Sequence, residues 1–90
     1  MNSSTPSADP RAVDVLVNSD ELTVDLADGR RLSVPLAWFP RLLHATQSQR
    51  EDWQLIADGL GIHWPALDED LSTEGLLRGA AAPDATKRAV

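Results

Sequence analysis

The sequence of 90 residues contains no cysteine and no tyrosine, and it has a single phenylalanine. Without cysteine, the chain can hold neither a disulfide nor a thiolate-bound metal ion. No apolar run approaches the roughly 18 residues of a transmembrane helix, and residues 1–11 lack the apolar core of a signal peptide. We therefore do not expect a multidomain enzyme, a secreted disulfide scaffold or a membrane-spanning protein. We expect a cytoplasmic protein.

Basic residues are scarce as well. Eight Lys and Arg against 14 Asp and Glu give a net charge of −6. The only adjacent basic pair between residues 13 and 79 is Arg30 with Arg31, at an expected turn. Nucleic acids and anionic membranes bind clustered basic side chains, so we expect neither as a direct partner. The acidity suits a basic protein partner instead.

Large aliphatic residues and phenylalanine are concentrated in the middle of the chain. Leu, Ile, Val and Phe are absent from residues 1–12, and Val90 is the only one in residues 80–90. This distribution predicts a disordered leader over residues 1–12, one domain over residues 13–79 and a disordered tail over residues 80–90. Because so small a domain buries little apolar surface, a homodimer would be more stable than a monomer.

Apolar and polar residues alternate in three successive segments, residues 13–17, 22–26 and 32–36. A period of two predicts three antiparallel strands in a meander. A three-residue loop over residues 27–29 places Val24 opposite Leu32, whereas a two-residue loop would set apolar residues opposite polar ones. We therefore expect the three-residue loop, with Gly29 at its left-handed position.

Short helices are predicted after the meander. Residues 37–45 carry an apolar helical face, with Pro40 in the first turn, where its missing N–H matters least. A capping box starts a further helical turn, either at Thr46 with Gln49 or at Ser48 with Glu51. Near the end of the domain, Ser72 is expected to cap a helix over residues 73–78 that ends at Gly79.

Residues 53–64 fit either a helix or a hairpin around Asp58 and Gly59. The hairpin is preferred because Asp-Gly suits a two-residue turn, which places Leu55 opposite Ile62 and Trp53 opposite Trp64. Pro65 closes this hairpin. The predicted fold class is α+β, a small antiparallel sheet made of the meander and the late hairpin, with two or three short helices on one face.

The strongest polar cluster is His63 with the carboxylates of Asp68, Glu69 and Asp70. A histidine with carboxylates can bind a divalent metal or transfer protons, and a metal site would use His63, Asp68 and Asp70. Three consecutive carboxylates do not converge without a sharp turn. We expect them to precede the helix N-terminus, where the dipole favours them, or to accept N–H groups of the loop.

No nucleophile elbow and no phosphate-binding glycine loop is present, so the sequence predicts neither an enzyme nor a bound cofactor. The three tryptophans either fill the core or anchor a partner. The candidate partner-binding residues are His63, Asp68, Glu69, Asp70, Glu74 and Trp38. The residues expected to be structural are Gly29, Asp58, Gly59, Trp53, Trp64, Pro65 and Ser72.

Two stretches, DGRRLSVPLAWFPRLL and GIHWPALDEDLSTEGLL, resemble the DUF2442 family of small bacterial domains of unknown function. The resemblance covers residues 13–79 and implies a small α+β fold with a meander, a short helix and a late strand ending in Trp-Pro. It departs at Gln47, where similar sequences often have proline.

Some family members are fused to a DNA-binding domain, which residues 80–90 are too short to form, and many are encoded beside another small protein in a toxin–antitoxin-like arrangement. The leading expectation is therefore a non-catalytic protein-interaction module, the antitoxin-like or accessory half of a two-gene pair. The alternative is a metal-binding or metal-dependent domain that uses His63 and the carboxylates of residues 68–70.

Overall fold

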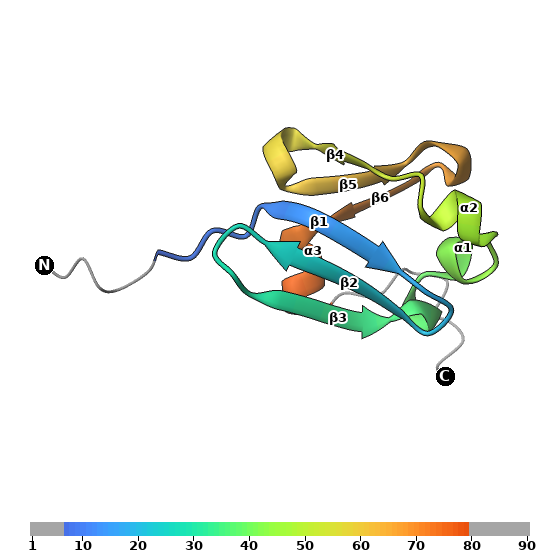
Figure 1. Ribbon diagram of the computed structural model, residues 1–90, viewed down its shortest axis with the longest axis horizontal. Helices are drawn as coiled ribbons and strands as arrows, with labels where there is room; N and C mark the ends of the chain where they lie inside the picture. Colours follow the sequence, from blue (N-terminus) through green and yellow to red (C-terminus); the bar gives the residue numbers. More distant parts are fainter. Residues whose placement is uncertain (1–6, 80–90) are drawn as a thin grey trace, which may run out of the picture.

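The computed structural model describes residues 7–79, which form two three-stranded antiparallel sheets and three short α-helices (Figure 1). Sheet A has the order β1-β2-β3 and sheet B the order β4-β5-β6. The predicted α+β class is confirmed, but the strands divide into two sheets instead of one. The strands are β1 (Ala12–Val17), β2 (Glu21–Leu26), β3 (Arg31–Pro35), β4 (Gln54–Ile56), β5 (Gly61–Trp64) and β6 (Glu69–Ser72). The helices are α1 (Pro40–Leu43), α2 (Gln47–Arg50) and α3 (Thr73–Arg78), and the 3-10 turns are η1 (Leu36–Trp38), η2 (Ala57–Gly59) and η3 (Pro65–Leu67).

Sheet A is the predicted meander. Val24 pairs with Leu32 and Leu22 with Val34, which confirms the three-residue loop. Gly29 has a φ of 94°, the left-handed conformation that this loop requires. The alternation turns the apolar side chains of β2 into the core and leaves Thr23 and Ser33 on the outer face, where their hydroxyls hydrogen-bond at 2.9 Å.

The N-terminal boundary differs from the expected one. β1 begins at Ala12, and a bulge at Val13 interrupts its pairing with β2. Within the predicted leader, the N–H of Asp9 donates to Asp28 in the turn of sheet A, and the Arg11 guanidinium donates to Asp58 in the turn of sheet B. Ala12 belongs to β1 and to the core, whereas the disorder of residues 7–11 stays a prediction. The rest of the predicted leader and the predicted tail lie outside the described residues.

The predicted helix over residues 37–45 is broken in two. η1 ends at Trp38 and α1 begins at Pro40, with Phe39 between them at φ −129° and ψ 85°. A proline disfavours the helical conformation of the residue before it, which explains the break at Phe39. Pro40 itself occupies the start of α1, where its missing N–H costs nothing.

The other predicted helix ends are confirmed. Thr46 accepts a hydrogen bond from the Gln49 N–H, and the Gln49 side chain accepts one from the Thr46 N–H, so the capping box is the first of the two alternatives. Ser72 caps α3 by accepting the N–H of Gly75 at 2.9 Å. Gly79 ends α3 with a φ of 82°.

Sheet B contains the predicted hairpin. Leu55 pairs with Ile62, and both Asp58 and Gly59 have positive φ, as expected. Ala57 also has positive φ, and the ladder stops at Ile56 and Gly61, so four residues connect the strands instead of two. The ladder begins at Gln54 and therefore does not include the expected Trp53–Trp64 pair.

The strand β6 was not predicted. Pro65 ends β5 as expected and starts η3, but the chain then returns along β5, with Asp70 opposite His63 and Glu69 opposite Trp64. The prediction that the acidic residues form a loop before a helix is therefore wrong for Glu69 and Asp70. Their low intrinsic preference for strands is overcome by pairing with β5.

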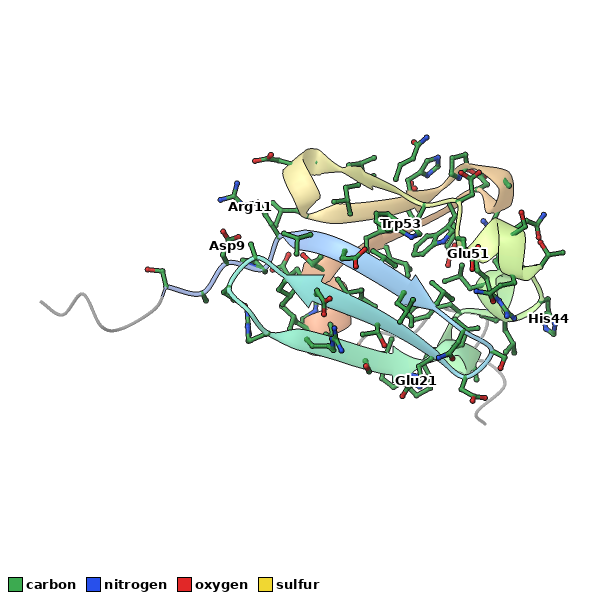
Figure 2. The ribbon with its side chains drawn as sticks, in the orientation of Figure 1. Asp9, Arg11, Glu21, His44, Glu51 and Trp53 are labelled. Carbon is green, nitrogen blue, oxygen red and sulfur yellow. The ribbon has the colours of Figure 1, made fainter. Side chains whose placement is uncertain are left out.

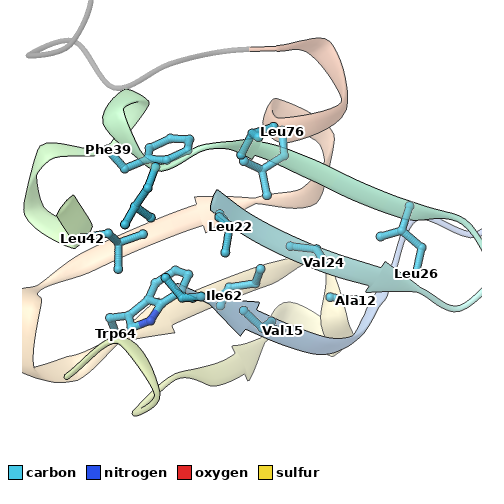
Figure 3. Close-up of a cluster of buried hydrophobic side chains, with 13 residues drawn as sticks. Ala12, Val15, Leu22, Val24, Leu26, Phe39, Leu42, Ile62, Trp64 and Leu76 are labelled. Atoms are coloured by element: carbon cyan, nitrogen blue, oxygen red, sulfur yellow. The ribbon is translucent and has the colours of Figure 1, made fainter. Parts of the chain in front are cut away.

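One core lies between the two sheets and the helices (Figure 3). Trp64 is fully buried, with 0% of its surface exposed, and its Nε1 donates to the carbonyl of Arg50 at 3.0 Å. Trp38 and Trp53 are half-buried and pack against this core. α1 and α2 lie together where β3 leads into β4, whereas α3 contacts β3 and adds Leu76 to the core (Figure 1).

The turn of sheet A is held by Asp28, whose side chain is only 6% exposed. Its carboxylate accepts the N–H groups of Asp9 at 2.8 Å and Arg30 at 3.0 Å and pairs with the Arg30 guanidinium at 2.8 Å. Hydrogen bonding to the Arg30 side chain, followed by the two backbone N–H groups, holds the pKa of Asp28 well below its usual range.

Replacing Trp64 by phenylalanine should destabilise the domain strongly. The change leaves a cavity and removes the hydrogen bond that the Trp64 side chain donates to the Arg50 carbonyl. We therefore expect the free energy of unfolding to fall by about 2–4 kcal/mol. Urea denaturation followed by circular dichroism measures it. Trp53→Phe, at a half-buried tryptophan, is the control, and equal losses in both variants would contradict the assignment of Trp64 to the centre of the core.

Asp28→Asn should lower the melting temperature at neutral pH. Because the pKa of Asp28 is lower in the folded state, its ionised form stabilises the fold above the unfolded-state pKa of about 3.9. The difference in melting temperature between the two proteins should therefore shrink as the pH falls below about 4. The control is Asp20→Asn, at an exposed position in the other turn of sheet A. A difference that grows on acidification would refute this role.

Candidate functional site

The candidate site lies on the outward face of sheet B. β5 directs Ile62 and Trp64 into the core, so the alternation of a strand directs His63 to the opposite face. The register then places Gln54 of β4 and Asp70 of β6 on either side of His63. His63 is thus the middle residue of a row across the outward face of sheet B.

His63 and Asp70 form a cross-strand pair. The Nδ1 atom of His63 contacts the Oδ1 atom of Asp70, and the histidine side chain is half-buried while the carboxylate is 67% exposed. Facing residues on neighbouring strands lie close enough for such a contact. The pair orients the imidazole ring and leaves most of the carboxylate open to solvent.

The other two carboxylates of the predicted cluster point elsewhere. Glu69 is opposite Trp64 and is mostly buried, on the other face of β6 from Asp70. Asp68 has a φ of 52°, and its carbonyl accepts a hydrogen bond of 2.6 Å from Arg41, whose guanidinium also lies 3.9 Å from Glu69. Of the predicted metal ligands, the structure therefore brings only His63 and Asp70 together.

A groove of about 520 Å³ continues the same face toward the end of sheet B. A second row across the sheet consists of Ile56, Gly61 and Ser72, which all line the groove. It runs parallel to the row of Gln54, His63 and Asp70. The groove is lined by Ile56, Ala57, Leu60, Gly61, Asp70, Leu71, Ser72, Thr73 and Glu74. It is shallow and open, and most of its lining is apolar.

Exposed aliphatic side chains stand next to exposed carboxylates in this groove. Ile56 is 39% and Leu60 45% exposed, whereas the side chains of Asp70 and Glu74 are 67% and 83% exposed. Glu74 lies 3.8 Å from Arg78, one turn along α3. Such an exposed ion pair contributes little stability, so it leaves the Glu74 carboxylate available to a ligand.

Gly61 is required by the side chain that covers it. A Cβ atom at this position would lie 2.8 Å from Cγ1 of Ile56, closer than real contacts allow. The Ile56 side chain therefore lies directly over the glycine. This packing holds an isoleucine on the outward face of the sheet without burying it.

The two sides of the groove are tied together beneath its surface. Thr73, which is fully buried, donates its N–H to the Leu60 carbonyl at 3.0 Å and its hydroxyl to the same oxygen at 3.4 Å. Ser72 is engaged in capping α3. The turn between β4 and β5 is thus fixed to the start of α3, and the groove has a defined shape.

A second depression, of about 580 Å³, lies between the start of β1 and the β4–β5 turn. Arg11 donates to Asp9 and to Asp58, and Val13 and Leu55 also line the depression. Figure 2 shows Asp9 and Arg11 where the chain enters β1. Hydrogen bonding to Arg11 lowers the pKa of Asp9, so this depression already contains paired charges.

The remaining predicted partner residues are placed differently. Glu74 lines the groove, whereas Trp38 does not: it packs edge-on against Phe39, with ring centroids 6.5 Å apart. Ile56 and Leu60 were not predicted to be partner-binding residues. The alternation of side chains in the predicted hairpin could have identified Ile56, because it places this apolar residue on the same face as the polar His63.

Two absences apply to the described part of the chain. Between residues 7 and 79, no group of three or more His, Asp or Glu side chains is arranged to hold a metal ion. In the same part, none of the helices has the length and apolar character needed to cross a membrane.

Comparisons with known proteins identify the family to which the chain belongs. No curated protein matches the chain. A crystal structure of a protein of unknown function from Rhodospirillum rubrum is 31% identical, with a TM-score of 0.72, over 83% of this chain and 93% of that one. An NMR structure of an uncharacterised protein from Chromobacterium violaceum is 27% identical, with a TM-score of 0.68, over 80% and 68% of the two chains. The family model described as "Protein of unknown function (DUF2442)" matches residues 12–82, and the chain belongs to this family.

Proposed function

We propose that this domain is a non-catalytic protein-interaction module whose partner is a basic protein. The observation that carries the proposal is the groove on sheet B, where exposed Ile56 and Leu60 adjoin the carboxylates of Asp70 and Glu74. Aliphatic side chains beside charged ones are typical of protein interfaces, in which apolar contact provides affinity and charge provides specificity.

The charge of the domain supports a basic partner. Residues 7–79 contain 13 Asp and Glu and six Arg, a difference of −7. A domain with this excess attracts basic proteins over long distances and accelerates their encounter. The groove would then select among the proteins that the overall charge attracts.

The family resemblance adds a source for the partner. Because many relatives are encoded beside another small protein, we propose that this chain is the accessory or antitoxin-like half of such a pair. A protein-binding role requires neither a cofactor nor a catalytic group. It also agrees with a location in the cytoplasm, where both products of such a gene pair would meet.

Metal binding is the weaker alternative. His63 and Asp70 supply two ligands, fewer than the three or four protein ligands of typical zinc sites. Calorimetric titration with Zn²⁺ tests this alternative directly. Heat of binding that disappears in His63→Gln would favour the metal over the protein partner.

The interaction is tested by co-expressing the chain with the product of the adjacent gene and measuring binding of the purified proteins. The double variant Asp70→Asn, Glu74→Gln should weaken the complex by roughly 5- to 30-fold, because it removes two charges from the contact surface. The control Asp52→Asn, Glu21→Gln makes the same charge change at exposed positions outside the groove.

The control variant should retain most of the affinity. Equal weakening by both variants would show that only net charge matters and would refute the groove as the interface. The absence of any complex between the two wild-type proteins would refute the proposed partnership.

A further inference from the structure

We infer that the groove on sheet B recognises a short segment in which a lysine or arginine stands next to an aliphatic residue. The inference rests on the proposed function and names the chemical feature of the partner that the groove accepts. It is carried by the way in which the apolar and the acidic halves of the groove are combined.

The apolar half fits both parts of such a segment. Ile56 at the end of β4 and Leu60 in the turn that follows are both exposed, and both line the groove. An aliphatic side chain of the partner would be partly removed from water against them. The methylene stem of a lysine or arginine packs on the same kind of surface while its charged end stays in water.

The acidic half provides the partner for the charged end. Asp70 and Glu74 line the groove, and both carboxylates are largely exposed. Their present contacts, to His63 and to Arg78, lie at the surface. An incoming cation can therefore pair with these carboxylates without breaking a buried ion pair.

The groove is formed before any ligand arrives. The double contact of Thr73 with the Leu60 carbonyl fixes its two sides, and Ile56 packs over Gly61 within the groove. Binding to a surface with a defined shape costs less conformational entropy than binding to a loop that must first become ordered. The depression around Arg11 is a poorer candidate, because its cation already pairs with two carboxylates.

The inference is tested by NMR titration of the ¹⁵N-labelled full chain with acetyl-Leu-Arg-Ala-Leu-amide. The control peptide replaces arginine by citrulline, which has nearly the same shape and no charge. We expect the arginine peptide to shift the amide signals of Gly61, Asp70 and Thr73, with a Kd of about 0.1–1 mM. The citrulline peptide should bind at least about fivefold more weakly.

Matched variants separate the two halves of the groove. Leu60→Ser should weaken binding of both peptides, whereas Glu74→Gln should weaken only the arginine peptide. Leu16→Ser is the control, because Leu16 is an exposed leucine on sheet A. The three variants change exposed side chains, and their amide spectra show directly whether the fold is retained.

The possible results distinguish this inference from the proposed function. Equal binding of both peptides, or shifts centred outside the groove, would overturn the inference. If neither peptide binds but the full partner does, in a manner that depends on Asp70 and Glu74, the inference is wrong and the interaction function stands. If the arginine peptide binds as described but no partner complex forms, the groove chemistry is correct and the proposed partnership is wrong.

Discussion

The rest of this domain depends on the buried side chain of Trp64. Its ring fills the space between the sheets, and its Nε1 donates to the carbonyl of Arg50 at the end of α2. The guanidinium of Arg50 in turn donates to the carbonyls of Leu42 and Leu43 at the end of α1. The side chains of Trp64 and Arg50 thus link sheet B and the core to both α1 and α2. In a chain without cysteine, such contacts take the place of a covalent link.

The same strand that buries Trp64 also creates the outward face. Because side chains alternate along β5, burial of Ile62 and Trp64 turns His63 outward, and the pairing with β6 brings Asp70 to it. Gly61 and Ile56 extend this face to the groove. A shift of register by one residue would expose the tryptophan and bury the histidine, so core and groove depend on one strand alignment.

Features governed by neighbouring residues could be predicted well. The loop at Gly29, the capping box at Thr46 and the start of α3 at Ser72 follow from turn and cap chemistry within a few residues. The break before Pro40 was not predicted, because the apolar residues on both sides of it share one helical face, while the restriction that proline places on Phe39 interrupts the helix. β6 was missed because its acidic residues give no strand pattern and pair only with a distant segment.

For the candidate site, the sequence by itself determined that His63 lies on the face opposite Trp64, because side chains alternate along a strand. It also determined that the domain is acidic, because net charge is a sum over residues. It did not determine which carboxylate meets His63. Three consecutive acidic residues look equivalent along the chain, and only the pairing of β6 with β5 turned Asp70 outward and Glu69 toward Arg41. The groove likewise needed the tertiary structure, because Ile56 and Glu74 are separated along the chain and become neighbours only when the start of α3 is bonded to the β4–β5 turn.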